Sequence, residues 1–87
     1  MMEINIRHEN GVALVSVKGS VTSTNAKEFE VAVAEEPKED GGIIIDAESL
    51  DYISSAGLRV IRSAKKRCKS LPFKIINVNP YGLVRMS

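Results

Sequence analysis

The sequence is poor in the residues from which disulfides and metal sites are built. Its 87 residues include one cysteine, Cys68, and one histidine, His8. A single cysteine cannot form an internal disulfide, and one Cys with one His cannot complete the usual tetrahedral zinc site. We therefore expect neither a disulfide nor a metal centre, and this cysteine usage is typical of a protein of the reducing cytosol.

Basic charge and aromatic side chains are also scarce. Twelve Lys and Arg residues face eleven Asp and Glu residues, which gives a formal net charge of +1, and the chain has no Trp, two Tyr and two Phe. Proteins that bind nucleic acids usually carry a marked basic excess, and single-strand binders stack bases on aromatic side chains. The composition therefore argues against direct binding of nucleic acid or of an anionic membrane.

Long apolar runs are missing as well. The start of the chain lacks the basic stretch and the roughly 7 to 15 apolar residues of a secretory signal, and no segment approaches the ~18 apolar residues of a membrane span. We therefore expect a cytoplasmic protein. The hydrophobic share of 44% and the charged share of 26% are ordinary for a globular chain. A chain of this length has room for one domain, which we expect to span residues 1–87.

Apolar spacing predicts an α/β fold in which helices pack against a mixed β-sheet, in the order ββαβαβ with a short final helix. Apolar residues alternate on both sides of Asn10-Gly11, which predicts an opening β-hairpin. The unbroken run Ile43-Ile44-Ile45-Asp46 predicts a central strand covered on both faces. The other predicted elements are a helix over about residues 25–35, a helix from Ser54 or Ser55 to about Ser70, a strand over residues 73–78 and a helix from Asn79-Pro80.

The second predicted helix has two distinct faces. At roughly 100° per residue, its apolar residues form one stripe, which we expect to face the sheet. The residues of this stripe are Gly57, Leu58, Val60, Ile61, Ala64 and Cys68. The opposite side carries Ser55, Arg59, Arg62 and Lys66. The pattern predicts close packing at Gly57 and an inert, buried thiol at Cys68.

The segment LDYISSAGLRVI, residues 50–61, closely resembles the signature of the STAS domain, the fold of bacterial anti-sigma factor antagonists. Residues 19–26, 43–46 and 74–80 are similar to other parts of the same domain, so the resemblance extends over nearly the whole chain. Two features depart from the family pattern. Ser54 stands where the family commonly has an acidic residue, and the chain ends early in the last helix of the family.

The resemblance implies a regulatory binding protein. In the family, the serine two residues before the motif glycine is phosphorylated by an anti-sigma factor that is also a serine kinase, and here this serine is Ser55. The unphosphorylated antagonist binds the anti-sigma factor and frees a sigma factor, and the phosphorylated form releases its partner. The resemblance implies no cofactor. The residues we expect to bind the partner are Ser54, Ser55, Ala56, Gly57, Arg59 and Arg62.

The same residues also have simpler explanations. Ser54 and Ser55 are both of a type that caps helix N-termini. The basic residues of the second helix fit a solvated outer face near a helix C-terminus. Asp46 and Asp51 are too few to predict a metal site, and capping or loop hydrogen bonds explain them better. The charged segment of residues 35–42 is expected to be a solvated loop without special chemistry.

Two other functions remain as alternatives to a phosphorylation-controlled antagonist. One is a STAS subunit that is not phosphorylated and regulates a membrane transporter, but a serine at position 55 favours the antagonist. The other is a small hydrolase, for which no Ser-His-carboxylate set can be placed, so we do not expect an enzyme. The short C-terminus, with Leu83, Val84 and Met86, further predicts an exposed apolar patch. We expect a tail that is either weakly ordered in the monomer or ordered by contact with a second copy in a weak homodimer.

Overall fold

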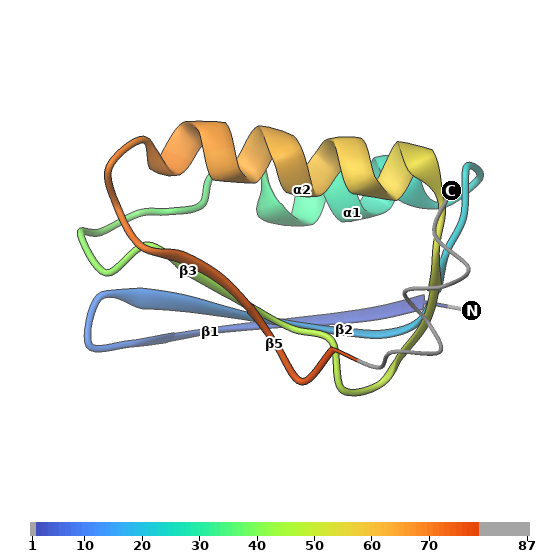
Figure 1. Ribbon diagram of the computed structural model, residues 1–87, viewed down its shortest axis with the longest axis horizontal. Helices are drawn as coiled ribbons and strands as arrows, with labels where there is room; N and C mark the ends of the chain where they lie inside the picture. Colours follow the sequence, from blue (N-terminus) through green and yellow to red (C-terminus); the bar gives the residue numbers. More distant parts are fainter. Residues whose placement is uncertain (1, 79–87) are drawn as a thin grey trace.

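The computed structural model describes residues 2–78, which form one five-stranded mixed sheet with two helices on one of its faces (Figure 1). The elements in chain order are β1 (Met2–Glu9), β2 (Val12–Val21), α1 (Ala26–Val33), β3 (Ile43–Asp46), β4 (Leu50–Ile53), α2 (Ser55–Cys68) and β5 (Phe73–Ile76). The predicted mixed α/β class is confirmed, with one strand more than expected. The helix predicted at Asn79-Pro80 and the apolar tail lie outside the described residues.

Strand β2 pairs with three of the other four strands of the sheet. It pairs with β1 in antiparallel fashion through the predicted hairpin, whose turn residues Asn10 and Gly11 have φ angles of 52° and 79°. On its other side β2 pairs in parallel with β3 and, further along, with β4. Strand β5 pairs in parallel with β3, so β3 is an interior strand, as predicted.

The strand β4 is the element that the sequence pattern did not predict. It has four residues, of which only Ile53 is buried, and Asp51 is exposed. Such a short segment has no clear alternation of apolar and polar residues. It becomes a strand because it pairs with β2 beyond an irregularity in register between Gly19 and Ser20. This pairing leads the chain directly into the start of α2.

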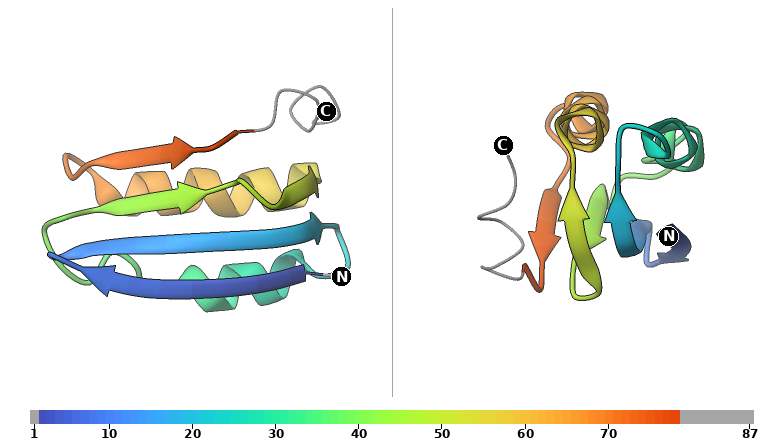
Figure 2. Two further views of the ribbon diagram at one scale, coloured as in Figure 1. Left: turned by 90° about the horizontal axis from the view of Figure 1, so that it is seen from below. Right: turned by 90° about the vertical axis from the view of Figure 1, so that its right-hand side faces the viewer.

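The core lies between the sheet and the helix layer (Figure 2). Its largest fully buried side chains are Phe29 of α1, Ile43 of β3, Val15 and Val21 of β2, and Cys68 of α2. Complete burial of an apolar side chain of this size stabilises the fold by roughly 1.5–3 kcal/mol. The buried residues of α2 are Gly57, Val60, Ala64 and Cys68, which confirms the predicted apolar stripe.

The prediction that β3 is covered on both faces is wrong for the part of the chain that the structure describes. Both helices lie on the same face of the sheet (Figure 2), against the buried Ile43 and Ile45. Ile44 points to the opposite face and is half-buried. An unbroken apolar run is typical of a strand covered on both faces in a parallel sheet. This sheet is mixed, because β1 pairs with β2 in antiparallel fashion, and such sheets can leave one face open to solvent.

The loop after α1 is also more structured than a solvated loop. Glu36 is 4% exposed, and its carboxylate accepts a hydrogen bond from His8 Nε2, with a distance of 3.0 Å to Oε1. Arg67 of α2 donates from Nε to the Glu36 carbonyl oxygen at 2.9 Å and from Nη2 to the Val33 carbonyl oxygen at 2.6 Å. Arg67 therefore ties the end of α1 and the segment after it to α2. The Val33 carbonyl oxygen also accepts from the Glu36 N–H at 3.0 Å.

Arg67→Ala should lower the free energy of unfolding by about 1–2 kcal/mol, since hydrogen bonds from a charged donor are lost at two carbonyl groups. Lys66→Ala is the matched control, because Lys66 is an exposed neighbour whose side chain makes no hydrogen bond within residues 2–78, and its effect should stay within about 0.5 kcal/mol. Urea unfolding of both variants measures the difference. Equal stabilities would contradict the structural role of Arg67.

Candidate functional site

Ser54 begins the candidate site as the N-cap of α2. Its backbone is extended, with φ −79° and ψ 169°, and its Oγ accepts a hydrogen bond from the Gly57 N–H at 3.2 Å. The Ser54 N–H donates to the Val21 carbonyl oxygen of β2 at 2.7 Å. Ser54 is 9% exposed. The capping interpretation of Ser54 is therefore confirmed, and the residue anchors the helix start to the sheet.

Ser55 is the first residue of α2 and has the opposite environment. It is exposed, and its hydroxyl makes no hydrogen bond within residues 2–78. Because Ser54 fills the N-cap position, the capping explanation of Ser55 does not hold. The structure thus separates the two serines: one is buried under the helix end, and the other presents its hydroxyl to solvent.

Gly57 brings α2 into close contact with the sheet. A Cβ atom at this position would lie 2.6 Å from Ile53 Cγ1 and 2.7 Å from Val21 Cγ1. Both neighbours are buried core residues, so neither can move aside at little cost. The predicted close packing at Gly57 is confirmed, and only a residue without a side chain fits here.

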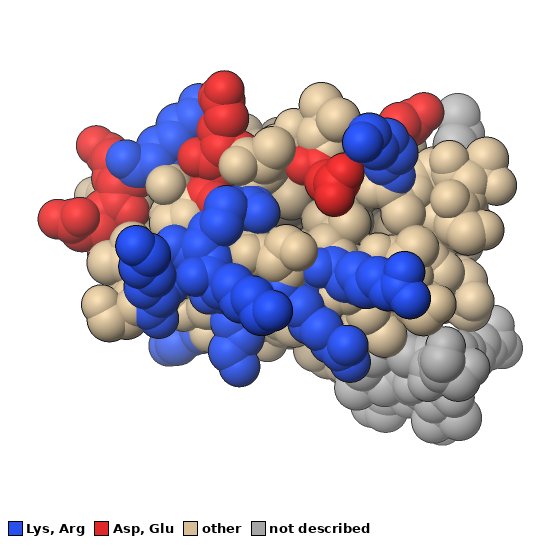
Figure 3. Space-filling view, turned by 90° about the horizontal axis from the view of Figure 1, so that it is seen from above, with Lys and Arg blue, Asp and Glu red and all other residues tan. Residues whose placement is uncertain are grey.

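The outer side of α2 is basic. Arg59 and Arg62 are exposed, as the sequence pattern predicts for the side opposite the apolar stripe. Figure 3 shows the row of Lys and Arg side chains along one half of the helix layer. The start of α2 thus presents the exposed Ser55 on the same outer side as Arg59 and Arg62.

A shallow groove of about 260 Å³ runs between the two helices next to this surface. Its lining includes Ala56, Arg59 and Ser63 of α2, with Ser23 and Glu30 on the α1 side. The α1 side of this groove was not among the predicted site residues. The run Thr22-Ser23-Thr24-Asn25 before α1 consists of residue types that cap helices, and nothing in the local sequence shows which helix packs beside it.

Asn25, the last residue before α1, has a role in the turn that its residue type alone does not predict. Its side chain does not cap α1. Instead, Asn25 Oδ1 accepts from the Thr22 N–H at 2.7 Å, and Nδ2 donates to the Ser20 carbonyl oxygen at 2.9 Å. These bonds fix the turn from β2 into α1, and this turn brings Ser23 to the groove.

The described residues offer little for a metal. Within residues 2–78 no three His, Cys, Asp or Glu side chains come together as a metal site. Asp46 Oδ1 accepts hydrogen bonds from the Glu48 N–H and from Asn77 Nδ2, both at 3.0 Å, which is the loop role favoured above. Burial raises the pKa of the Cys68 thiol, and this is the expected state of an inert core cysteine.

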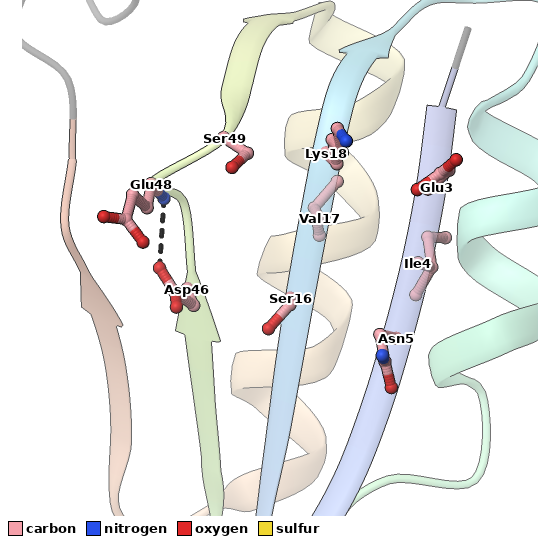
Figure 4. A pocket seen from close by; sticks show the side chains of 9 residues that line it. All are labelled: Glu3, Ile4, Asn5, Ser16, Val17, Lys18, Asp46, Glu48 and Ser49. Carbon is pink, nitrogen blue, oxygen red and sulfur yellow. Dashed lines mark hydrogen bonds between the residues drawn. The ribbon is translucent and has the colours of Figure 1, made fainter.

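A second hollow lies on the helix-free face of the sheet (Figure 4). It measures about 550 Å³ and lies over β1, β2 and the turn after β3. Polar side chains dominate its lining, among them Glu3, Ser16, Lys18 and Asp46. None of the residues that line this hollow belongs to α2, so it is separate from the surface around Ser55. No helix of residues 2–78 is long and apolar enough to cross a membrane.

Comparison with known proteins gives one family match and a curated relative. The model of the STAS domain family matches residues 3–86. A protein of Bordetella bronchiseptica that is provisionally named anti-sigma factor antagonist BtrV is 30% identical over 76 residues. The match covers 86% of this chain and 66% of that protein, so the chain spans just under two thirds of its relative.

Solved structures share the fold. An anti-sigma factor antagonist from Mycobacterium paratuberculosis superposes with a TM-score of 0.77 at 21% identity, covering 86% of this chain and 66% of the other. The unphosphorylated form of the anti-sigma factor antagonist SpoIIAA gives a TM-score of 0.73 at 10% identity, covering 91% and 76%. At these identities the likeness shows that the fold is the same.

Gly57→Ala should destabilise the protein, because the new methyl group overlaps two buried side chains at a cost of about 1–3 kcal/mol. This loss should outweigh the gain of about 1 kcal/mol that alanine brings to a helix interior. Ser63→Ala, on the exposed side of the same helix, is the control and should change the stability by less than about 0.5 kcal/mol. A thermal melt in which Gly57→Ala is the more stable variant would refute the close packing.

Ser54→Ala should cost about 1 kcal/mol of unfolding free energy, since the Gly57 N–H loses its acceptor. Ser55→Ala should leave the stability within about 0.5 kcal/mol of wild type, because the exposed hydroxyl has no partner among the described residues. Guanidinium unfolding distinguishes the two neighbouring serines. A larger loss for Ser55→Ala than for Ser54→Ala would mean that the capping assignment is wrong.

Proposed function

This chain belongs to the STAS domain family, and from that premise we propose that it is an anti-sigma factor antagonist switched off by phosphorylation of Ser55. The unmodified protein binds an anti-sigma factor that is also a serine kinase, and the bound anti-sigma factor no longer holds its sigma factor. The names carried by the Bordetella relative and by the Mycobacterium structure support the antagonist function. The proposed partner-binding residues are Ser54 to Gly57, Arg59 and Arg62.

The observation that carries the proposal is the exposed position of Ser55 at the start of α2. A kinase needs a hydroxyl that it can reach, and Ser55 has one without an intramolecular partner within residues 2–78. Ser54, the neighbouring serine, is buried and engaged as the N-cap, so it does not compete for the kinase. The helix start is held in place by Ser54 and Gly57, so the kinase meets a defined surface.

The modification is a phosphoryl transfer from ATP. Ser55 Oγ attacks the γ-phosphorus, a new O–P bond forms, and the bond between the γ-phosphorus and the β–γ bridging oxygen breaks. ADP leaves, and the hydroxyl proton passes to a base of the kinase. The phosphate lies at the positive end of the α2 dipole, where the Ser55 and Ala56 N–H groups make no backbone hydrogen bond within residues 2–78. Arg59 one turn on can pair with it. The helix therefore tolerates the phosphate.

Release of the partner follows from the change in surface. Phosphorylation adds a charge of about −1.5 to −2 and three acceptor oxygens. A partner surface that contacts a small neutral hydroxyl must then desolvate a dianion or withdraw. The alternative, a transporter-regulating subunit without phosphorylation, makes no use of the exposed Ser55 hydroxyl, so we favour the antagonist.

Incubation with the cognate anti-sigma kinase and ATP should add one phosphate to the protein, located at Ser55 by peptide mapping. Ser55→Ala should accept none and should stay bound to the kinase in the presence of ATP. Ser55→Asp should bind at least about tenfold more weakly than Ser55→Ala, since a fixed carboxylate carries part of the charge of a phosphate. Calorimetry measures the affinities, and circular dichroism should show the same fold for all variants.

Ser63→Ala serves as the matched control, because Ser63 is an exposed serine two turns further along the same helix. It should be phosphorylated and released like the wild type. Phosphate found on Ser63, or equal affinities of the Asp and Ala variants at position 55, would rule out Ser55 as an electrostatic switch.

A further inference from the structure

Ser55 lies at the head of a continuous row of basic side chains. Arg59, Arg62 and Lys66 follow Ser55 at steps of four, three and four residues, which places them on one face of α2, and Lys69 is the C-cap residue directly after the helix. All are exposed. We define the basic stripe as Arg59, Arg62, Lys66 and Lys69. From Ser55 to the end of the stripe the helix rises by about 20 Å, which is long enough to contact a partner over several helical turns.

Within residues 2–78 no side chain of the stripe forms an ion pair. Residues 55–68 contain five Lys and Arg residues and no Asp or Glu. Lys27 and Glu30 form an ion pair within residues 2–78, and His8 contacts the Glu36 carboxylate; neither contact involves the stripe. Arg67 differs from the stripe residues, because its guanidinium donates hydrogen bonds to two carbonyl groups of the same molecule.

An uncompensated stripe of this kind is unfavourable for the isolated helix. Like charges three or four residues apart repel one another and weaken a helix, whereas a solvated face usually mixes both signs. The cations near the C-terminal end gain from the helix dipole, but Arg59 and Arg62 lie in the first two turns, where the dipole disfavours them. The dipole alone therefore does not explain the stripe.

We infer that the basic stripe docks an acidic surface of the anti-sigma factor. This inference rests on the proposed function and specifies the chemistry of the partner. It also explains how one phosphate acts on a long interface: a charge of about −1.5 to −2 at Ser55 cancels a large part of the positive charge beside it and repels the partner's carboxylates. Binding and release then depend on the same charges.

A protein partner fits the stripe better than an anionic membrane does. Acidic side chains lie on the α1 half of the same face (Figure 3), and α1 contributes the exposed Glu28 and Glu30. A flat anionic bilayer would contact both halves and repel these carboxylates, whereas an acidic ridge of a protein can contact α2 alone. The stripe also carries no apolar or aromatic side chain that could insert between lipids.

The test compares two double variants that change the net charge equally. Arg62→Glu/Lys66→Glu reverses the middle of the stripe, and Lys18→Glu/Lys74→Glu reverses two exposed lysines of the strands β2 and β5. Affinity for the purified anti-sigma kinase is measured by calorimetry at about 50 and 300 mM salt. The stripe variant should bind at least about tenfold more weakly than wild type, and the control should stay within about twofold. Wild-type affinity should fall steeply with salt.

The binding measurements distinguish failure of the acidic-partner inference from failure of the proposed function. If wild type binds the kinase but both double variants bind as tightly, the acidic-partner inference is wrong and the proposed function survives. If wild type does not bind the kinase at all, the proposed function fails and the inference with it. Binding to vesicles with one third phosphatidylserine that needs the stripe, without an effect of the stripe on kinase binding, would assign the surface to a membrane. Salt-sensitive dimers in sedimentation, with the same lack of effect on the kinase, would assign it to a second copy. Both results overturn the inference.

Discussion

The close approach of α2 to the sheet at Gly57 is the constraint on which the site depends. With no side chain at this position, the helix start lies directly on Ile53 and Val21, and any Cβ atom would overlap them. The Ser54 hydrogen bonds act at the same place, one to the helix and one to β2. Together they fix both the height and the rotation of α2. The rotation decides that the next residue, Ser55, faces solvent.

This arrangement separates the residues that hold the fold from the residues of the proposed switch. The inner side of the helix start, with Ser54 and Gly57, holds the fold, and the outer side, with Ser55 and Arg59, is free to change. A phosphate on the outer side touches no core contact, so it alters charge and shape at the surface while the packing beneath stays intact. A domain of this size has a small core, and the proposed switch, confined to the surface, would leave its stability untouched.

Local periodicity predicted the parts of the molecule that depend on neighbouring residues. The hairpin at Asn10-Gly11 and the buried and exposed faces of α2 follow from turn chemistry and helical spacing, so the exposure of Ser55, Arg59 and Arg62 was predictable. The strand β4, the open face of β3 and the buried Glu36 were not. Glu36 is buried through contacts with His8 and Arg67, which lie 28 and 31 residues away in the sequence. No local pattern records such contacts, and the α1 side of the groove was missed for the same reason.

The central claim is that phosphorylation of Ser55 changes the surface and leaves the fold intact. The most direct measurement compares backbone amide NMR spectra and hydrogen exchange of the unmodified and the stoichiometrically phosphorylated protein. Changes in amide chemical shift should be confined to the start of α2, the turn before α1 and the residues beside Ser55. Exchange protection in β2 and β3 should stay unchanged. Shift changes and loss of protection that extend through the sheet would show that the phosphate acts by unfolding or rearranging the domain, and would contradict the account.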